Sequence, residues 1–189
     1  MKEIFPKNKK GLVFLAGFMG SGKSTIGPIL ANSLGYKYVD MDRYIEEKAQ
    51  KKIVDIFSSE GEQAFRTLER NTLIEVTELN HCVVALGGGT IANEENLHVV
   101  SQKGILIYLK LSPEEIIHRV QFRTDRPMLK DAQGNQLGPV ELEKRIHELL
   151  SKREPFYMRA DVVIFADKMR VGATVDEIMK EIRPLMGKE

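Results

Sequence analysis

The sequence predicts an α/β domain built on a parallel β-sheet. Five short apolar runs, rich in β-branched or aromatic residues, recur along the chain, and a segment with helical spacing follows each of them. Continuous apolar strands are typical of a sheet that is covered on both faces. The alternation of strands and helices then implies parallel strands joined by right-handed crossovers. The predicted strands cover residues 12–16, 36–40, 83–86, 105–109 and 161–165.

The length and composition indicate one globular domain over residues 1–189. A chain of 189 residues can bury one sizeable core, and its contents of 42% hydrophobic and 29% charged residues are ordinary for such a domain. The formal net charge of +1 creates no overall field that would attract nucleic acid or an anionic membrane. We therefore expect neither as a partner, and any attraction for anions must be local.

The cysteine content and the N-terminal sequence point to a compartment. Cys82 is the only cysteine, so no intrachain disulfide can form, and a reducing environment is expected. The first ten residues are polar and lack the apolar segment of a secretory signal. No apolar stretch reaches the length of a transmembrane helix. We expect a soluble, cytoplasmic protein.

Capping residues mark the starts of three predicted helices. Ser112 precedes Pro113 and completes a capping box with Glu115. Asn93 is placed to cap the helix after the third strand. Thr174 begins a second capping box before an apolar helical face, and we expect the last helix to start there.

The segment after the first strand, GFMGSGKSTIG, is a phosphate-binding loop. Gly17, Gly22, Lys23 and Ser24 match G-x-x-x-x-G-K-[ST], with a strand before and a helix after, as the motif requires. Glycines let backbone N–H groups converge on phosphate oxygens, and the start of the helix adds positive potential. Lys23 supplies a charge for the β- and γ-phosphates, and the Ser24 hydroxyl is a magnesium ligand. We predict phosphate contacts from Gly20, Ser21, Gly22, Lys23, Ser24 and Thr25.

Two other interpretations of this loop fit less well. A chance glycine-rich turn would not be expected to reproduce the whole motif in its whole context. The dinucleotide-binding pattern G-x-G-x-x-G would need a third glycine where Thr25 stands.

Asp40 and Asp42 follow the second predicted strand. In an open parallel sheet, ligands collect beyond the carboxyl ends of the strands, so both acids are expected near the phosphate-binding loop. One carboxylate is suited to the magnesium shell, and the other to accepting or orienting a substrate hydroxyl. The alternative for Asp42 is that it only caps a helix over residues 43–50.

The third predicted strand ends in LGGGT. Most P-loop proteins carry a magnesium-binding acid near the end of a sheet strand, and glycine stands at that place here. The absence of an acid assigns the metal role to Asp40. Three consecutive glycines, Gly87, Gly88 and Gly89, let the backbone approach a ligand closely, whereas a tight strand-to-helix turn would usually need one.

Three arginines are candidates for binding a carboxylate or a phosphate, for which guanidinium is the natural bidentate partner. Arg66 lies on a predicted helix, next to Phe65 of its core face, and Arg153 lies just before Pro155, where we expect a helix to end. Arg126 lies in the long polar segment 123–139, which is typical of a functional lid or of disorder. Taken singly, each arginine is better explained as a solvated surface residue.

Together, these motifs resemble those of the shikimate kinases. The match runs in order along nearly the whole chain, through GFMGSGKSTIG, DMD, EGEQAFRTLE, LGGGT, RPML and REPFY. A P-loop alone is shared by many phosphotransferases, whereas the ordered combination is far more specific. The resemblance implies a three-layer P-loop kinase fold with a five-stranded parallel sheet in the order 2-3-1-4-5. It also implies a mobile lid at about 123–139 and a substrate-binding region at about 41–79.

The resemblance further implies a reaction and site roles. Shikimate kinases use ATP and Mg²⁺ to phosphorylate the 3-hydroxyl of shikimate in aromatic amino-acid biosynthesis. In that family, the matches to Asp42 and the three glycines bind the hydroxyls of shikimate, and those to Arg66 and Arg153 bind its carboxylate. The expected catalytic residues are Lys23, Asp42 and Arg126, with Arg126 also on the phosphates, and the expected metal-site residues are Ser24 and Asp40.

The same resemblance gives candidates at the edges of the site. Arg119 matches an arginine that stacks on adenine, and Lys168 and Arg170 are further candidates for the adenine site. Phe57 and Phe65 are either apolar walls of the substrate pocket or plain core residues. We expect a monomeric enzyme.

Two rival functions remain. A gluconate kinase, or another small-metabolite P-loop kinase, would share the architecture and the P-loop but would grip its acceptor without the Phe65-Arg66 pair and the triple glycine. A non-catalytic nucleotide sensor would be favoured if Asp42 or Arg66 were missing, and both are present.

Overall fold

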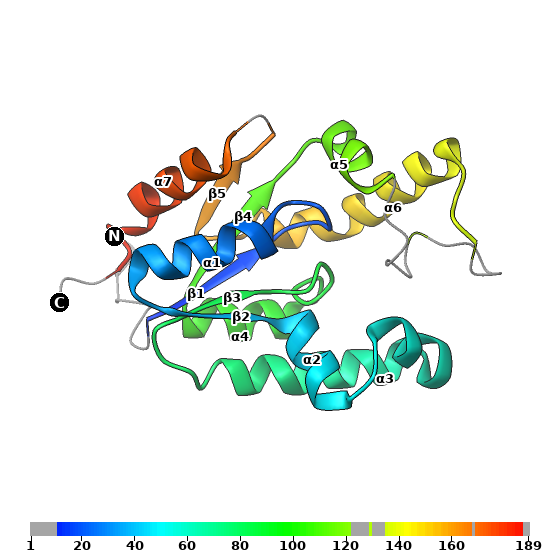
Figure 1. The fold of residues 1–189 in the computed structure, drawn as a ribbon, viewed down its shortest axis with the longest axis horizontal. Coiled ribbons are helices and arrows are strands. Elements are labelled where there is room, and N and C mark those ends of the chain that lie inside the picture. The colour runs from blue at the N-terminus through cyan, green and yellow to red at the C-terminus, as the bar shows by residue number, and fades with distance from the viewer. Residues whose placement is uncertain (1–10, 122–128, 130–134, 168, 187–189) are drawn as a thin grey trace.

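Five parallel strands form one sheet at the centre of the fold (Figure 1). The computed structural model describes residues 11–121, 129, 135–167 and 169–186. Its strands are β1 (Leu12–Ala16), β2 (Lys37–Asp40), β3 (Cys82–Ala85), β4 (Ile105–Lys110) and β5 (Val162–Phe165). They lie in the order β2-β3-β1-β4-β5, and every neighbouring pair is parallel. The predicted fold class and strand order are confirmed.

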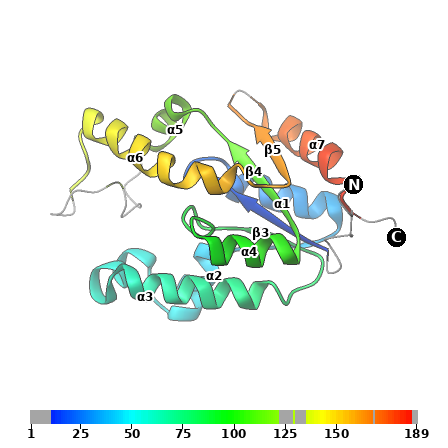
Figure 2. The same ribbon diagram turned by 180° about the vertical axis from the view of Figure 1, so that it is seen from behind.

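Helices cover both faces of this sheet. They are α1 (Lys23–Leu34), α2 (Met41–Ala49), α3 (Ile53–Val76), α4 (Glu94–Lys103), α5 (Pro113–Val120), α6 (Pro139–Tyr157) and α7 (Val171–Ile182). Helices α1 and α7 lie on the face seen in Figure 1, and α3, α4 and α6 lie on the face seen in Figure 2. Among the described residues, no helix is both long and apolar enough to span a bilayer.

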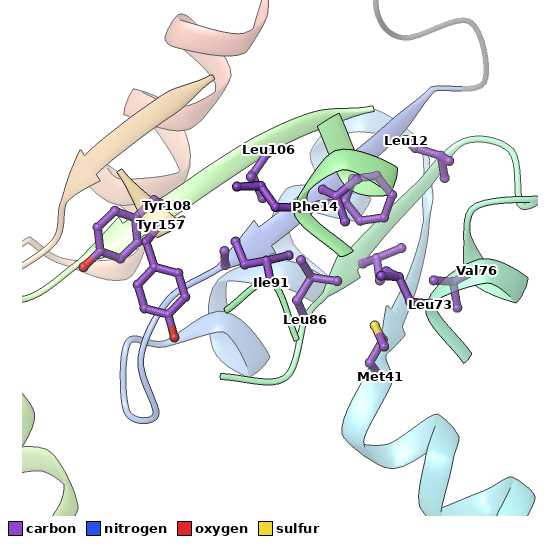
Figure 3. Close-up of a cluster of buried hydrophobic side chains, with 14 of the residues drawn as sticks. Leu12, Phe14, Met41, Leu73, Val76, Leu86, Ile91, Leu106, Tyr108 and Tyr157 are labelled. Carbon is purple, nitrogen blue, oxygen red and sulfur yellow. The ribbon is translucent and has the colours of Figure 1, made fainter. Parts of the chain in front are cut away.

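Strand β1 lies in the middle of the core. Leu12 and Phe14 pack against residues of α3, α4 and the end of α6 (Figure 3), whereas Val13 and Leu15 pack against α1 and α7. Successive side chains of a strand point to opposite faces, so one strand serves both layers. Burying each such side chain contributes about 1.5–3 kcal/mol. The strand is thereby fixed, and so is the point at which the loop after it begins.

Two of the three predicted helix caps are confirmed. The side chains of Ser112 and Asn93 accept hydrogen bonds from the backbone N–H groups three residues later, at the starts of α5 and α4. The third prediction is wrong, because α7 starts at Val171 and not at Thr174. Thr174 is buried one turn inside the helix, where its hydroxyl donates to the carbonyl of Arg170.

The prediction that Pro155 ends a helix is also wrong. Helix α6 runs through Pro155 to Tyr157. Proline removes one backbone donor, but the next turn still closes, with the Met158 N–H donating to the Glu154 carbonyl over 2.9 Å. Tyr157 is fully buried against Tyr108, and this packing holds the last turn in place (Figure 3).

Candidate active site

A cavity of about 620 Å³ opens at the carboxyl ends of the central strands. Its walls come from the loop after β1, the β2–α2 junction, α3, the loop after β3, and α6. These elements are far apart in sequence, but the parallel sheet brings their ends to one edge. Ten residues predicted for the site line this cavity: Ser24, Asp40, Asp42, Phe57, Phe65, Arg66, Gly87, Gly88, Gly89 and Arg153.

The phosphate-binding loop (residues 17–25) leads directly into α1. Gly22 is the N-cap of α1 with φ 95°, a left-handed conformation that glycine adopts without strain. The ammonium group of Lys23 donates to the carbonyls of Gly17 and Phe18 over 2.7 and 3.1 Å. The lysine side chain therefore folds back against the first residues of its own loop.

A second cavity, of about 310 Å³, lies on the other side of the loop. Arg119 lines it and donates to the Gly20 carbonyl over 3.2 Å. Arg170 is the N-cap of α7 and is not among its lining residues, and Arg126 and Lys168 lie outside the described residues. The lining residues are Gly20, Ser21, Gly22, Thr25, Ile26, Arg119, Ala166, Met169, Val171 and Thr174.

Asp40, and not Asp42, is the N-cap of α2. One oxygen of Asp40, Oδ1, accepts the backbone N–H groups of Asp42 and Arg43 over 3.1 and 3.4 Å. The alternative that Asp42 only caps a helix is therefore wrong. Asp42 lies in the first turn of α2, and its side chain lines the cavity.

The other oxygen of Asp40, Oδ2, faces the phosphate-binding loop. It accepts hydrogen bonds from the hydroxyls of Ser24 and Tyr38, over 3.2 and 3.3 Å. Burial, and after it the Asp40 charge, raises the pKa of Tyr38, so this phenol is a donor at neutral pH.

The pair of Ser24 and Asp40 fits Mg²⁺. Hydroxyl and carboxylate oxygens are the hard donors that this ion prefers, and it is usually held by one or two side chains together with phosphates and water. No group of three or more histidine, cysteine or acidic residues in the described part of the chain could hold a metal ion. Two side-chain oxygens beside the phosphate-binding loop suit an ion that is shared with the phosphates of a nucleotide.

Arg66 is held in place by two glutamates on its own helix. Its guanidinium donates to Glu69 over 2.7 Å and to Glu62 over 3.0 Å. Burial lowers the pKa of Arg66, but the two carboxylates outweigh burial and raise it, so the group stays charged. Glu69 is only 2% exposed and also accepts the hydroxyl of Thr90, from the loop after β3.

Arg153 and Tyr157 lie one turn apart on α6, and both side chains lie close to Gly88 in the loop after β3. Arg153 is buried, with its guanidinium 5.6 Å from the centre of the Phe18 ring. The Tyr157 hydroxyl donates to the carbonyl of Gly88. Burial raises the pKa of Tyr157 to about 12, so the phenol keeps its proton.

Two of the three consecutive glycines lie close to polar side chains, whereas a Cβ atom on Gly88 would make only ordinary contacts, the nearest at 3.6 Å. A Cβ atom on Gly87 would lie 2.8 Å from Oδ1 of Asp42, and one on Gly89 would lie 2.8 Å from the Arg66 guanidinium. Both distances are shorter than side chains tolerate. Neither glycine has a positive φ, so the space that it leaves for the ends of the Asp42 and Arg66 side chains, and not backbone freedom, favours glycine at these two positions.

Phe57 and Phe65 satisfy both of the interpretations left open by the sequence. Their ring centroids are 4.7 Å apart, and both line the large cavity. They also belong to a small hydrophobic cluster with Ile45 and Ile56. One face of this aromatic pair is therefore core and the other is wall.

Sequence reasoning missed Glu69, Tyr157 and Tyr38. A usable signal existed for Glu69. It is a charged residue on the buried face of α3, between Phe65 and Thr72. For Tyr157, the sequence offers only an ordinary core aromatic, because its hydroxyl partner, Gly88, lies on another element. For Tyr38, the partner Asp40 lies two residues further along the same strand, and this spacing was a usable signal because such residues share one face of a strand.

Comparison with known proteins gives a consistent result. A family model described as "Shikimate kinase" matches residues 19–183. A protein named shikimate kinase from Chlorobaculum tepidum is 50% identical over 171 residues, which cover 90% of each chain. A solved shikimate kinase from Acinetobacter baumannii, in complex with shikimate, has a TM-score of 0.85 and 32% identity, covering 96% of this chain and 97% of that one.

A gluconokinase from Sinorhizobium meliloti also resembles the fold, with a TM-score of 0.56 and 15% identity. The match covers 95% of each chain. At this identity the likeness concerns the architecture alone.

Proposed function

The chain belongs to the shikimate kinase family, and from this premise we propose that it transfers the γ-phosphoryl group of ATP to the 3-hydroxyl of shikimate. The products are shikimate 3-phosphate and ADP. One observation carries the proposal: a single cavity joins two arginines and an aspartate to the residues that fit a nucleotide-bound Mg²⁺. Such a site provides for a carboxylate, for hydroxyls and for a phosphoryl donor.

We assign acceptor binding to the acceptor cluster, defined as Asp42, Arg66, residues 87–89 and Arg153. The guanidinium groups of Arg66 and Arg153 bind the carboxylate of shikimate, since arginine matches carboxylate geometry. Backbone atoms of the glycines and the Asp42 carboxylate bind the hydroxyls, and the Phe57–Phe65 pair contacts the ring. Asp42 accepts the proton of the attacking hydroxyl and orients it.

The phosphate-binding loop holds the donor. Its backbone amides bind the phosphates, and Lys23 leaves its loop carbonyls to neutralise the transferring group. Ser24 and Asp40 hold Mg²⁺, which when bound neutralises charge on the β- and γ-phosphates. Arg126 adds a further positive charge, and closure of the lid at about 123–139 excludes water from the reaction.

The adenine end and the biological setting complete the proposal. Arg119 lines the second cavity with the loop, which supports its place beside the base, and Lys168 and Arg170 are proposed as neighbours. The enzyme acts as a cytoplasmic monomer in aromatic amino-acid biosynthesis, without a nucleic-acid or membrane partner.

The rival kinase is less well supported. Gluconate is an open-chain acid, whereas shikimate has a ring that can lie against the aromatic wall formed by Phe57 and Phe65. The presence of both Asp42 and Arg66 in one cavity likewise argues against a nucleotide sensor that performs no chemistry.

A coupled assay of ADP release tests the proposal. With ATP and Mg²⁺ present, we expect ADP to be released only when shikimate is added, among a panel that also contains gluconate and quinate. Release with gluconate but not with shikimate would overturn the proposed function.

A further inference from the structure

The Asp40 carboxylate is held by four hydrogen bonds, two on each oxygen. Backbone N–H groups of Asp42 and Arg43 bind Oδ1, and the hydroxyls of Ser24 and Tyr38 bind Oδ2. A carboxylate offers about four acceptor positions, so a direct bond from Asp40 to a cation would replace one of these hydrogen bonds. Three of the four donors belong to the helix cap or to the phosphate-binding loop. The fourth, Tyr38, belongs to neither.

The ring of Tyr38 is fixed against the helix that carries Ser24. On α1, Gly27 lies one turn after Ser24, and a Cβ atom there would overlap the Tyr38 ring, lying 3.0 Å from Cδ2 and closer still to Cε2. Tyr38 also lies within β2, paired with Val83 of β3. The phenol is therefore held from two sides, by a strand of the sheet and by α1.

From this arrangement we propose that Tyr38 is a positioning residue for the metal end of the active site. Its hydroxyl holds Oδ2 of Asp40 on the side that faces Ser24. The inference rests on the proposed function, because it assumes that Ser24 and Asp40 face a nucleotide-bound Mg²⁺.

The Tyr38 hydroxyl matters because Ser24 has two tasks. The oxygen of Ser24 is proposed to bind a cation, and its hydroxyl proton is donated to Asp40. Ser24 holds the carboxylate only as long as this proton points toward Asp40. Without Tyr38, Oδ2 would keep only the Ser24 hydroxyl as a hydrogen-bond donor, while Oδ1 stays bound to the backbone N–H groups of Asp42 and Arg43, so the carboxylate would be held less firmly on the side that faces Ser24. Hydrogen-bond partners behind a metal site typically affect metal affinity by 10- to 100-fold when they are removed.

Tyr38→Phe tests the inference, because it keeps the ring in its slot and removes only the hydroxyl. ADP binding is measured by calorimetry, once with Mg²⁺ and once with EDTA. We expect the gain in affinity that Mg²⁺ provides to fall by about tenfold. Affinity in EDTA, the KM for shikimate and the thermal unfolding temperature should stay near the wild-type values.

Two further variants make the test selective. Tyr36→Phe removes a phenol just before β2, at the other end of the strand from Asp40, and should leave the Mg²⁺-dependent gain unchanged. Gly27→Ala adds a methyl group that pushes the Tyr38 ring off its place, and should cause the same selective loss while the hydroxyl is retained.

The inference is overturned if Tyr38→Phe leaves the Mg²⁺-dependent gain intact, or if it weakens ADP binding equally in Mg²⁺ and in EDTA. The second result would mean that Tyr38 only supports the fold. These measurements contain no shikimate. A wild-type protein that fails to phosphorylate shikimate would therefore overturn the proposed function while the Tyr38 result still stood.

Discussion

The phosphate-binding loop and the acceptor cluster lie at the same edge of the sheet but are built differently. The loop is one contiguous stretch whose shape comes from backbone geometry, with Gly22 at the start of α1. The acceptor cluster draws on α2, α3, the loop after β3, and α6. Its arginines are fixed by side-chain contacts such as Arg66 to Glu69.

This difference predicts different consequences of mutation. A change in the loop should affect the charge that meets the phosphoryl group, and therefore turnover. A change in the acceptor cluster should affect recognition of the acceptor, except at Asp42, which contacts the reacting hydroxyl in our proposal. Variants in the two regions should therefore differ in whether kcat or the KM of one substrate changes more.

The largest effect is expected for Lys23→Met. The side chain is similar in length but carries no charge, so stabilisation of the transferring phosphoryl group is lost. We expect kcat to fall by about 10³-fold or more, with shikimate affinity near normal. Steady-state kinetics with both substrates varied, together with calorimetry of shikimate binding, would check this. A kcat within tenfold of the wild type would contradict the assignment.

Asp42→Asn should come next. The amide keeps the shape but cannot accept the proton of the hydroxyl, so we expect kcat to fall by about 10²-fold. Asp55→Asn is the matched control, because Asp55 lines the same cavity from α3 and has no assigned role. Equal losses in both variants would indicate a general effect of charge in the cavity and would remove Asp42 from the mechanism.

Arg66→Lys should raise the KM for shikimate by about tenfold and leave the Kd for ADP unchanged. Lysine keeps the positive charge beside Glu69 but cannot bind a carboxylate with two parallel N–H groups. Arg70→Lys, one turn further along α3 and outside the large cavity, serves as the control. If ADP binding weakened as much as shikimate binding, the two ends of the site would not be separable as proposed.

The smallest effect is expected for Tyr157→Phe. It removes the hydrogen bond to Gly88 and should lower the free energy of unfolding by about 1 kcal/mol and raise the KM for shikimate a few-fold. The folded-state pKa of Tyr157, about 12, lies above the ordinary value of 10.0. Its neutral phenol therefore stabilises the fold fully below pH 10, and this contribution is lost as the pH rises toward 12. Denaturant unfolding at pH 8 and pH 11 should show a smaller pH effect in the variant.

Sequence patterns predicted the fold well, because burial on both faces leaves a visible mark. The five strands are continuous apolar runs, and their observed bounds differ from the predicted ones by at most one residue at either end. The start of α7 and the continuation of α6 past Pro155 were wrong, because both depend on packing against distant elements. A cap motif at Thr174 and a proline describe only local preference.

The predicted site residues divide along the same line. Sequence motifs predicted the residues of the phosphate-binding loop and of the acceptor cluster, because the type and spacing of these residues already indicate their chemistry. Glu69 and Tyr157 were missed because each has a partner on another element, Thr90 and Gly88 respectively. Tyr38 was missed because its packing against α1 at Gly27 is not visible in the sequence. The spacing of Tyr38 and Asp40, two residues apart on β2, places both side chains on one face of the strand, but it does not specify that this face meets Ser24 at the start of α1.

The buried carboxylate of Glu69 has a consequence for how acceptor specificity can change during evolution. Replacing Arg66 by a neutral residue removes the ion-pair partner of the buried Glu69 carboxylate, which then keeps the hydrogen bond from the Thr90 hydroxyl. Because Arg66 is partly exposed, the cost should lie below the about 3–5 kcal/mol that is typical when a fully buried ion pair loses one member. If the enzyme evolved to accept an uncharged substrate by losing Arg66, the single variant would be destabilised unless Glu69 changed at the same time. Such pairwise epistasis would keep a lineage bound to acidic acceptors long after selection for them has relaxed.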